Sequence, residues 1–343
     1  IATLVIFWLI TISQFGGTKN TAKIAKVGFF VGIVATGIIL FILGIVYIAQ
    51  GNPIKVSFGS GAWIPDFTKI NTLVVFVSFI LAYAGVESSA SHVKDMDNPG
   101  KNYPKAILIL VVATILLDTL GGATVAATIP QNQLSLDTGV IQAYSYLIHH
   151  FGGGEWLVRL IAVVICLGVI AEIAAWVVGP STAMLEAAEN GLLPKQMAKV
   201  NQHNVPINIV LVQGIIVSIW AVVLTLGGGG ANLSFFVAMA LTVCIYLVAY
   251  VLLFLSYIKL VKEKDDLTRT YHIPGGKNVK IGVAMVGLLV SIFSFFISFF
   301  PPSDIGSGKG GTYLAILIIS WLIIVVIPFV IYKYVGEKAS DKK

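Results

Sequence analysis

The sequence predicts an all-α protein that crosses a lipid bilayer many times, on three observations. Of its 343 residues, 57% are hydrophobic and 11% are charged, whereas soluble globular domains carry about 25% charged residues. The apolar residues gather in windows of roughly 20, the length that a helix needs to cross the hydrocarbon layer. Lys and Arg are concentrated in alternate segments between these windows. We therefore expect a single polytopic transmembrane domain over residues 1–343.

Nine windows are apolar enough to form membrane spans. In chain order they cover residues 1–14, 24–49, 71–93, 106–129, 156–178, 207–226, 233–258, 281–300 and 312–332. The first is shorter than a whole span. Helix-breaking residues fall between windows, at Asn98-Pro99-Gly100, Gly179-Pro180, residues 227–230 and Pro301-Pro302. We therefore expect Gly179-Pro180 to end the fifth helix, with a further helical stretch at the inner surface over 181–190.

The basic residues predict the orientation of the chain. Five alternate segments contain 18 of the 22 Lys and Arg residues, and the four segments on the other side contain 4. Basic residues are enriched in cytoplasmic loops, so the first group is expected in the cytoplasm. Ile1 would then lie outside and Lys343 inside. If the full protein starts in the cytoplasm, an odd number of spans precedes Ile1, and the chain is expected to be a fragment.

Gly85-Val86-Glu87 is the strongest candidate for a functional site. It lies with several serines inside a window that is otherwise apolar. A carboxylate in hydrocarbon is costly, and a broken helix is tolerated there only where it lines a cavity. We therefore expect the helix to break at Gly85, with Glu87 at the break. The alternative is that Glu87 marks the interfacial end of a span that stops near Ala84.

Two further pairs have the i, i+4 spacing that places both side chains on one helix face. Glu172 and Trp176 lie in the fifth window, and Tyr246 and Tyr250 lie in the middle of the seventh. Intramembrane charges and mid-span hydroxyls need polar partners, which can be a substrate or a neighbouring helix. The alternatives are an ion pair for Glu172 and structural hydrogen bonds for the tyrosines. Asp118, in the fourth window, is expected to be a structural charge.

Several other classes of function are not supported by the sequence. Cys166 and Cys244 lie within apolar runs, so neither a disulfide nor a metal site is indicated. The spans contain no cluster of His, Cys and Asp, which argues against an enzyme and a cofactor. The chain also lacks the rings of charge or the filter-like loop of a channel. The net charge of +6 is explained by orientation and indicates no nucleic acid.

Five segments together resemble the glutamate/γ-aminobutyrate antiporters of the amino acid–polyamine–organocation superfamily. They are residues 16–26 (GGTKNTAKIAK), 83–92 (YAGVESSASH), 98–104 (NPGKNYP), 167–176 (LGVIAEIAAW) and 272–277 (HIPGGK). The resemblance covers nearly the whole chain. Two departures are Asp118, where a small polar residue is expected, and the short tail after Tyr334.

The resemblance implies a twelve-helix protein of the leucine-transporter type with inverted repeats. The chain would then be a fragment with helices four to twelve, lacking the first three transmembrane helices. The substrate path would be lined by Gly85, Val86, Glu87, Glu172, Trp176, Tyr246 and Tyr250. The implied activity is acid-stimulated exchange of extracellular glutamate for intracellular γ-aminobutyrate, contributing to acid resistance, in the plasma membrane of a bacterium. A cytosolic glutamate decarboxylase is the implied functional partner. The alternatives are exchange of another amino acid with its decarboxylation product, or a general amino acid permease.

The orientation that the distribution of Lys and Arg predicts can be tested by labelling single cysteines in sealed cells. Cysteines introduced at Asn132 and Gly229 should react with an impermeant thiol reagent added outside, because both lie in segments poor in basic residues. A cysteine at Gly275 should stay unlabelled until the cells are opened. Labelling of Gly275 from outside would reverse the predicted orientation.

Overall fold

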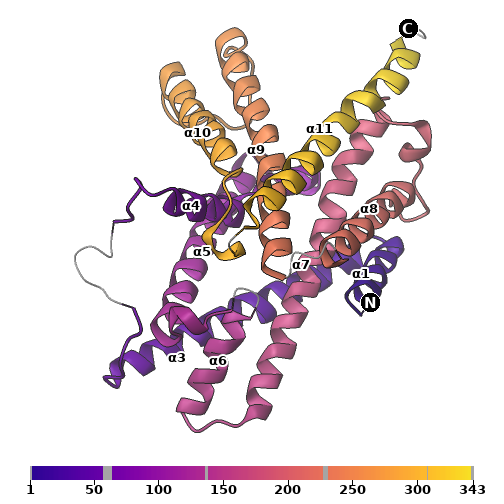
Figure 1. Cartoon of the computed structure of the whole chain (residues 1–343). Helices are drawn as coiled ribbons and strands as arrows, with labels where there is room; N and C mark the ends of the chain where they lie inside the picture. The colour runs from indigo at the N-terminus through magenta and orange to yellow at the C-terminus, as the bar shows by residue number, and fades with distance from the viewer. Residues whose placement is uncertain (1, 57–63, 136–137, 227–230, 307, 341–343) are drawn as a thin grey trace. The chain divides into compact units, whose positions relative to one another are not determined.

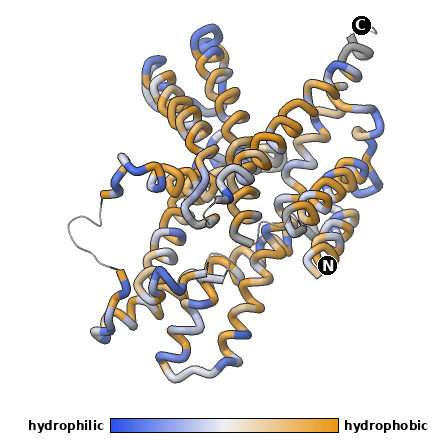
Figure 2. The backbone as a smooth tube through the Cα atoms, in the orientation of Figure 1, coloured by the Kyte–Doolittle hydropathy of each residue, from blue (hydrophilic) through white to orange (hydrophobic). Residues whose placement is uncertain are grey.

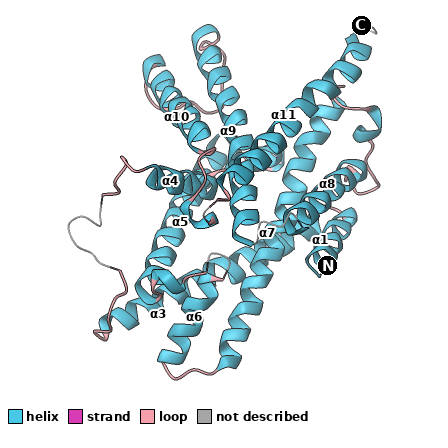
Figure 3. Cartoon of the chain, in the orientation of Figure 1, coloured by secondary structure: helices cyan, strands magenta, loops and turns pink. Residues whose placement is uncertain are grey.

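The computed structural model describes residues 2–56, 64–135, 138–226, 231–306 and 308–340, and every regular element in these ranges is a helix (Figures 1 and 3). The longer elements are α1 (Ala2–Ser13), α2 (Thr18–Val27), η2 (Gly28–Ala35), α3 (Thr36–Ala49), α4 (Ile70–Tyr83), η3 (Val86–Asp95), α5 (Pro99–Thr128), α6 (Gly139–His150), α7 (Glu155–Glu189), α8 (Ile207–Leu226), α9 (Ala231–Glu263), α10 (Lys277–Ile297) and α11 (Gly310–Ser340). The chain divides into two compact units, which are described separately. Unit 1 comprises Ile1–Ile64, Ile109–Asn190 and Pro194–Ser218, and unit 2 comprises Pro65–Leu108, Gly191–Leu193 and Ile219–Lys343.

The helices confirm that the chain is an all-α, multi-pass membrane protein. Within the described residues, seven helices are long and apolar enough to cross a membrane: Thr21–Ala49, Ile70–Ala90, Pro99–Thr128, Glu155–Glu189, Leu233–Glu263, Lys277–Ile297 and Gly310–Val335. Two shorter apolar helices cover Ala2–Gly16 and Ile207–Val223. Each of these nine overlaps one of the predicted windows. Figure 2 shows them as mostly hydrophobic stretches of tube, with hydrophilic residues in many of the connections.

Helix α6 was not predicted from the sequence, which indicated only a loop there. It buries one face in unit 1, formed by Ala143, Tyr144, Leu147 and Ile148. The hydroxyl of Tyr144 donates a hydrogen bond to the backbone carbonyl of Thr36. Helix α6 is only 12 residues long, too short to span the bilayer. It therefore packs against the spans as an amphipathic segment.

The prediction that Gly179-Pro180 ends the fifth helix is wrong. Helix α7 continues through both residues to Glu189, a length of 35 residues. A proline inside a helix removes one backbone donor and bends the helix without necessarily ending it. The further helical stretch expected over 181–190 is therefore the second half of α7.

Small residues allow η2 to approach α7 closely in unit 1. A Cβ atom added at Gly32 would lie 2.4 Å from the backbone nitrogen of Gly168. One added at Gly28 would lie 2.2 Å from the Cβ atom of Ala171. Without a hydrophobic driving force between helices in lipid, such close backbone packing contributes much of their association. This contact fixes the part of α7 that precedes Glu172.

The loop between α9 and α10 ties the ends of both helices together in unit 2. The Nζ atom of Lys280, a buried residue, lies 2.8 Å from Oδ1 of Asp265, and a guanidinium nitrogen of Arg269 lies 3.5 Å from the same atom. The hydrogen bond from Lys280 lowers the pKa of the Asp265 carboxyl below its ordinary value. The loop also contacts the start of α5, where a Cβ at Gly100 would lie 2.7 Å from Cβ of Thr270.

The close packing of η2 on α7 predicts opposite effects for two Gly→Ala substitutions. Gly32→Ala should lower the apparent melting temperature of the purified protein, because overpacking typically costs about 1–3 kcal/mol. Gly122→Ala, on α5, is the matched control, since a Cβ there meets no atom within 4 Å. It should be neutral or stabilising, because Ala favours a helix over Gly by about 1 kcal/mol. Equal melting temperatures for the two variants would contradict the packing described.

Candidate functional site at the broken helix

The helix break predicted at Gly85 is confirmed. Helix α4 ends at Tyr83, Ala84 has extended backbone angles, and Gly85 adopts a left-handed conformation with φ 97°. Residues with a Cβ atom rarely adopt this backbone conformation, whereas glycine adopts it without steric cost. The η3 helix then begins at Val86. The apolar span assigned by composition runs on to Ala90, and whether Glu87 lies within the membrane or at its surface stays a prediction.

The carboxylate of Glu87 closes the break. Its Oε2 atom accepts a hydrogen bond from the hydroxyl of Tyr250 at 2.8 Å and one from the backbone N–H of Gly85 at 3.2 Å. The same N–H also points at the Tyr250 hydroxyl oxygen, at 3.1 Å. Hydrogen bonds to a charged acceptor are about twice as strong as neutral ones. Glu87, Gly85 and Tyr250 therefore form one polar cluster at the point where the helix is interrupted.

Helix α9 supplies a row of aromatic rings beside this cluster. The ring centroids of Tyr246 and Tyr250 are 5.9 Å apart, and those of Tyr250 and Phe254 are 6.5 Å apart. The three residues follow each other at intervals of four, so they share one face of the helix. The structure therefore brings Tyr246 and Tyr250 to the same part of unit 2 as Gly85, Val86 and Glu87.

Ser89 and Tyr103 were not predicted as site residues. The Ser89 hydroxyl donates to the Val86 carbonyl at 2.6 Å and lies 3.1 Å from the hydroxyl of Tyr103. This contact connects η3 to α5 directly behind the break. Tyr103 belongs to a segment that was singled out by its resemblance to a family, but the pattern alone did not indicate which residue it contacts.

Glu172 and Trp176 both lie in unit 1. They project from α7 one turn apart, and both are exposed on that unit. Glu172 forms no ion pair with another described residue, so the structural alternative of an ion pair gains no support. Asp118 is exposed on α5 and also has no ion pair among the described residues. The roles of these three residues stay predictions.

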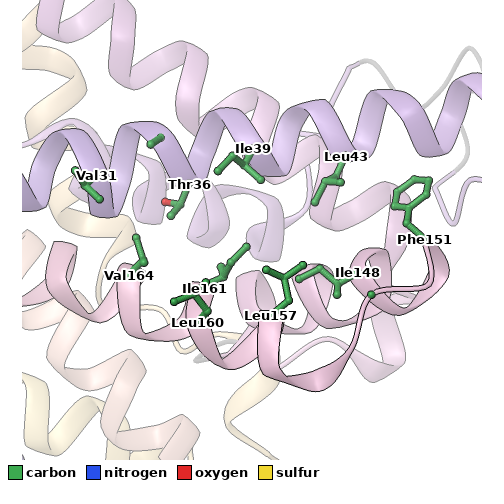
Figure 4. Close-up of a pocket in the computed structure, with 12 residues that line it drawn as sticks. Val31, Thr36, Ile39, Leu43, Ile148, Phe151, Leu157, Leu160, Ile161 and Val164 are labelled. Carbon is green, nitrogen blue, oxygen red and sulfur yellow. The ribbon is translucent and has the colours of Figure 1, made fainter.

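Unit 1 contains a cavity of about 500 Å³ that is unsuited to an amino acid. Its walls are almost wholly apolar, and Figure 4 shows the side chains of Val31, Ile39 and Leu43 facing those of Leu157 and Ile161 across it. A zwitterion needs polar partners for both charged ends, because an unpaired charge is costly in apolar surroundings. None of the predicted site residues lines this cavity. The cluster at Glu87 is therefore the stronger candidate. No group of three His, Cys, Asp or Glu residues that could hold a metal occurs in the described part of the chain.

Comparison with known proteins agrees with the fold. The sequence profile described as amino acid permease matches residues 1–327. Two glutamate/γ-aminobutyrate antiporters of Lactococcus lactis, from the subspecies lactis and cremoris, are 51% and 52% identical to the chain over 342 residues. Each alignment covers 99% of this chain and 68% of the relative. An uncharacterized transporter of Legionella pneumophila is 30% identical over 340 residues, 99% of this chain and 73% of its own length.

The cluster at the break predicts energetic coupling between Glu87 and Tyr250. Tyr250→Phe removes a hydrogen bond to a charged group, which is typically worth about 1.5–3 kcal/mol, and should lower the apparent melting temperature. In a Glu87→Gln background the same substitution should cost clearly less, because the charged acceptor is already gone. Tyr257→Phe, two turns along α9, is the matched control and should have little effect in either background. Additive effects of Tyr250→Phe and Glu87→Gln would argue against the described contact.

Proposed function

This chain belongs to the amino acid permease family, and we propose that it exchanges extracellular glutamate for intracellular γ-aminobutyrate across the cell membrane. The observation that carries this proposal is the identity of 51% and 52% to two antiporters of that name over 99% of the chain. The polar cluster at the broken helix supplies chemistry that suits an amino acid. Exchange of another amino acid with its decarboxylation product is the alternative, and a panel of substrates separates the two.

The broken helix offers groups that can bind the charged ends of a substrate. Backbone N–H groups freed at a helix break can bind a carboxylate, and freed carbonyls can bind an ammonium group. In the structure the N–H of Gly85 and the hydroxyl of Tyr250 are directed at Glu87. A substrate carboxylate presents the same kind of acceptor. We infer that substrate and Glu87 compete for these two donors.

Protonation of Glu87 supplies a reason for acid stimulation. A carboxylate only accepts hydrogen bonds, whereas a protonated carboxyl can donate one. A protonated Glu87 would accept more weakly from Gly85 and Tyr250, which would leave both donors available to a substrate carboxylate. Tyr246, Val86, Glu172 and Trp176 are proposed to line the rest of the substrate path. Each of these four residues would contact the substrate directly as it passes.

The exchange would remove protons from the cytosol when it is combined with a glutamate decarboxylase. Decarboxylation replaces the bond between the α-carbon and the carboxylate with a C–H bond, takes up one proton and releases CO₂. Export of γ-aminobutyrate against import of glutamate then removes one proton equivalent per cycle. We propose this decarboxylase as the functional partner, and acid resistance as the result. The partition of basic residues supports a cytoplasmic C-terminus.

Reconstituted protein from the complete reading frame provides the test. Vesicles loaded with γ-aminobutyrate should take up labelled glutamate much faster at about pH 5.5 than at about pH 7.5, since glutamate side chains titrate near pH 4.3 and are more often neutral in acid. Glu87→Gln should flatten this pH profile or abolish uptake. Asp118→Ser, which removes a carboxylate from another helix, should do neither.

Two outcomes would contradict the proposal in different ways. Uptake driven by another amino acid and its amine, without glutamate uptake, would favour the alternative exchange. Unchanged rate and pH profile in Glu87→Gln would leave the exchange in place and withdraw the role of Glu87.

A further inference from the structure

The interior proline of α7 leaves one backbone carbonyl without its usual partner. Pro180 has no N–H, so the carbonyl of Trp176, four residues earlier, lacks the donor that an α-helix supplies at that spacing. In a membrane protein such a carbonyl must find another donor, because hydrocarbon provides none. This carbonyl belongs to a residue that the proposed function places on the substrate path.

Gln213 on α8 supplies the missing donor. Its Nε2 atom donates to the Trp176 carbonyl at 3.3 Å, over a sequence separation of 37 residues. The other amide atom, Oε1, is buried and has no hydrogen-bond partner among the described residues. A buried amide that leaves its oxygen unpaired is costly. Among the described residues, the Gln213 amide therefore bonds through its donor.

Buried apolar side chains pack beside this bond. Val210, less than one turn before Gln213, is buried and packs with Val177 and Val205. Val177 directly follows Trp176 in the chain. Buried apolar residues therefore lie next to the donor on α8 and next to the acceptor on α7. All of these residues belong to unit 1.

Two neighbouring carbonyls in the same turn of α7 also accept hydrogen bonds from side chains. The Ala174 carbonyl accepts from Nε2 of Gln14 at 2.9 Å, and the Val178 carbonyl accepts from the hydroxyls of Ser181 and Thr182, each at 2.9 Å. Side-chain donors of this kind bend helices. The turn from Ala174 to Val178, where an interior proline is expected to bend α7, therefore has carbonyls bonded to side chains of another segment and of α7 itself.

We propose that Gln213 is a positioning residue for exchange, which holds the bend of α7 before Pro180 and thereby sets the direction of Trp176 and Glu172. The inference rests on the proposed function, because that function places both side chains on the substrate path. Gln213 is not among the residues proposed to line the substrate path. Its effect should reach the substrate only through the backbone of Trp176.

The test combines Gln213→Met, which keeps the length of the side chain without its donor, with Pro180→Ala, which gives the Trp176 carbonyl its own helical donor. Spin labels at Val163 and Met184, both exposed on α7, report the bend as a distance. The labels are placed in protein whose Cys166 and Cys244 are replaced. Gln213→Met should shift or broaden the distance distribution and raise the KM for glutamate several-fold. In the Pro180→Ala background it should change neither quantity further.

The controls separate positioning from folding and from the proposed function. Thr225→Val, on the same helix, removes a hydroxyl that donates to the carbonyl of Ala221. It should change neither the distance between the spin labels nor the KM for glutamate. Gln213→Ala is a second variant for the case that Gln213→Met does not fold. The inference would be overturned if Gln213→Met and Gln213→Ala both left the distance and the KM unchanged. It would also be overturned if Gln213→Met had the same effect in the wild-type and in the Pro180→Ala background. If the distance responds as expected but wild-type protein exchanges neither substrate, the proposed function fails while the support of the bend by Gln213 stands.

Discussion

The requirement that every backbone polar group in hydrocarbon has a partner decides where this chain can depart from a regular helix. At two of these departures, Gly85 and Pro180, a side chain supplies what the helix has lost. At Gly85 the freed N–H donates to the carboxylate of Glu87, which also accepts from Tyr250. At Pro180 the freed carbonyl of Trp176 accepts from Gln213. Glu87, the residue that stands out most from the apolar sequence, is therefore a partner that its irregular turn needs.

The same requirement explains why the departures are supported by close packing. Side-chain donors hold a backbone group only if their own helices are fixed, and in lipid such fixing comes from contact between helices. Gly32 and Gly168 let the backbones of η2 and α7 meet before Pro180. In the other unit, Ser89 and Tyr103 connect η3 to α5 behind the break. Irregular turns and small or hydroxyl-bearing contacts thus occur together.

Much of the fold was predictable from the sequence because hydropathy acts over windows of a whole span. The helix break was predictable for a related reason, since a carboxylate after a glycine conflicts with the apolar residues around Glu87. Helix α6 was missed because its four buried residues face the protein over only 12 residues. The continuation of α7 was missed because a helix can continue through a proline, and the order of residues near Pro180 does not reveal distant contacts such as that of Gln213. Pairing between distant segments, such as Glu87 with Tyr250, needs the structure.

The ion pair in the loop between α9 and α10 has a consequence for the acid tolerance of the molecule. The pKa of the Asp265 carboxyl is lowered by its hydrogen bond from Lys280. A lowered pKa means that the stabilisation is complete above the ordinary value of about 3.9 and is lost only as the pH falls through the lower, folded value. The loop that ties α9 to α10 therefore keeps its charge through mild acid. The hairpin that carries Tyr250 is therefore held by the same ion pair in mild acid as at neutral pH.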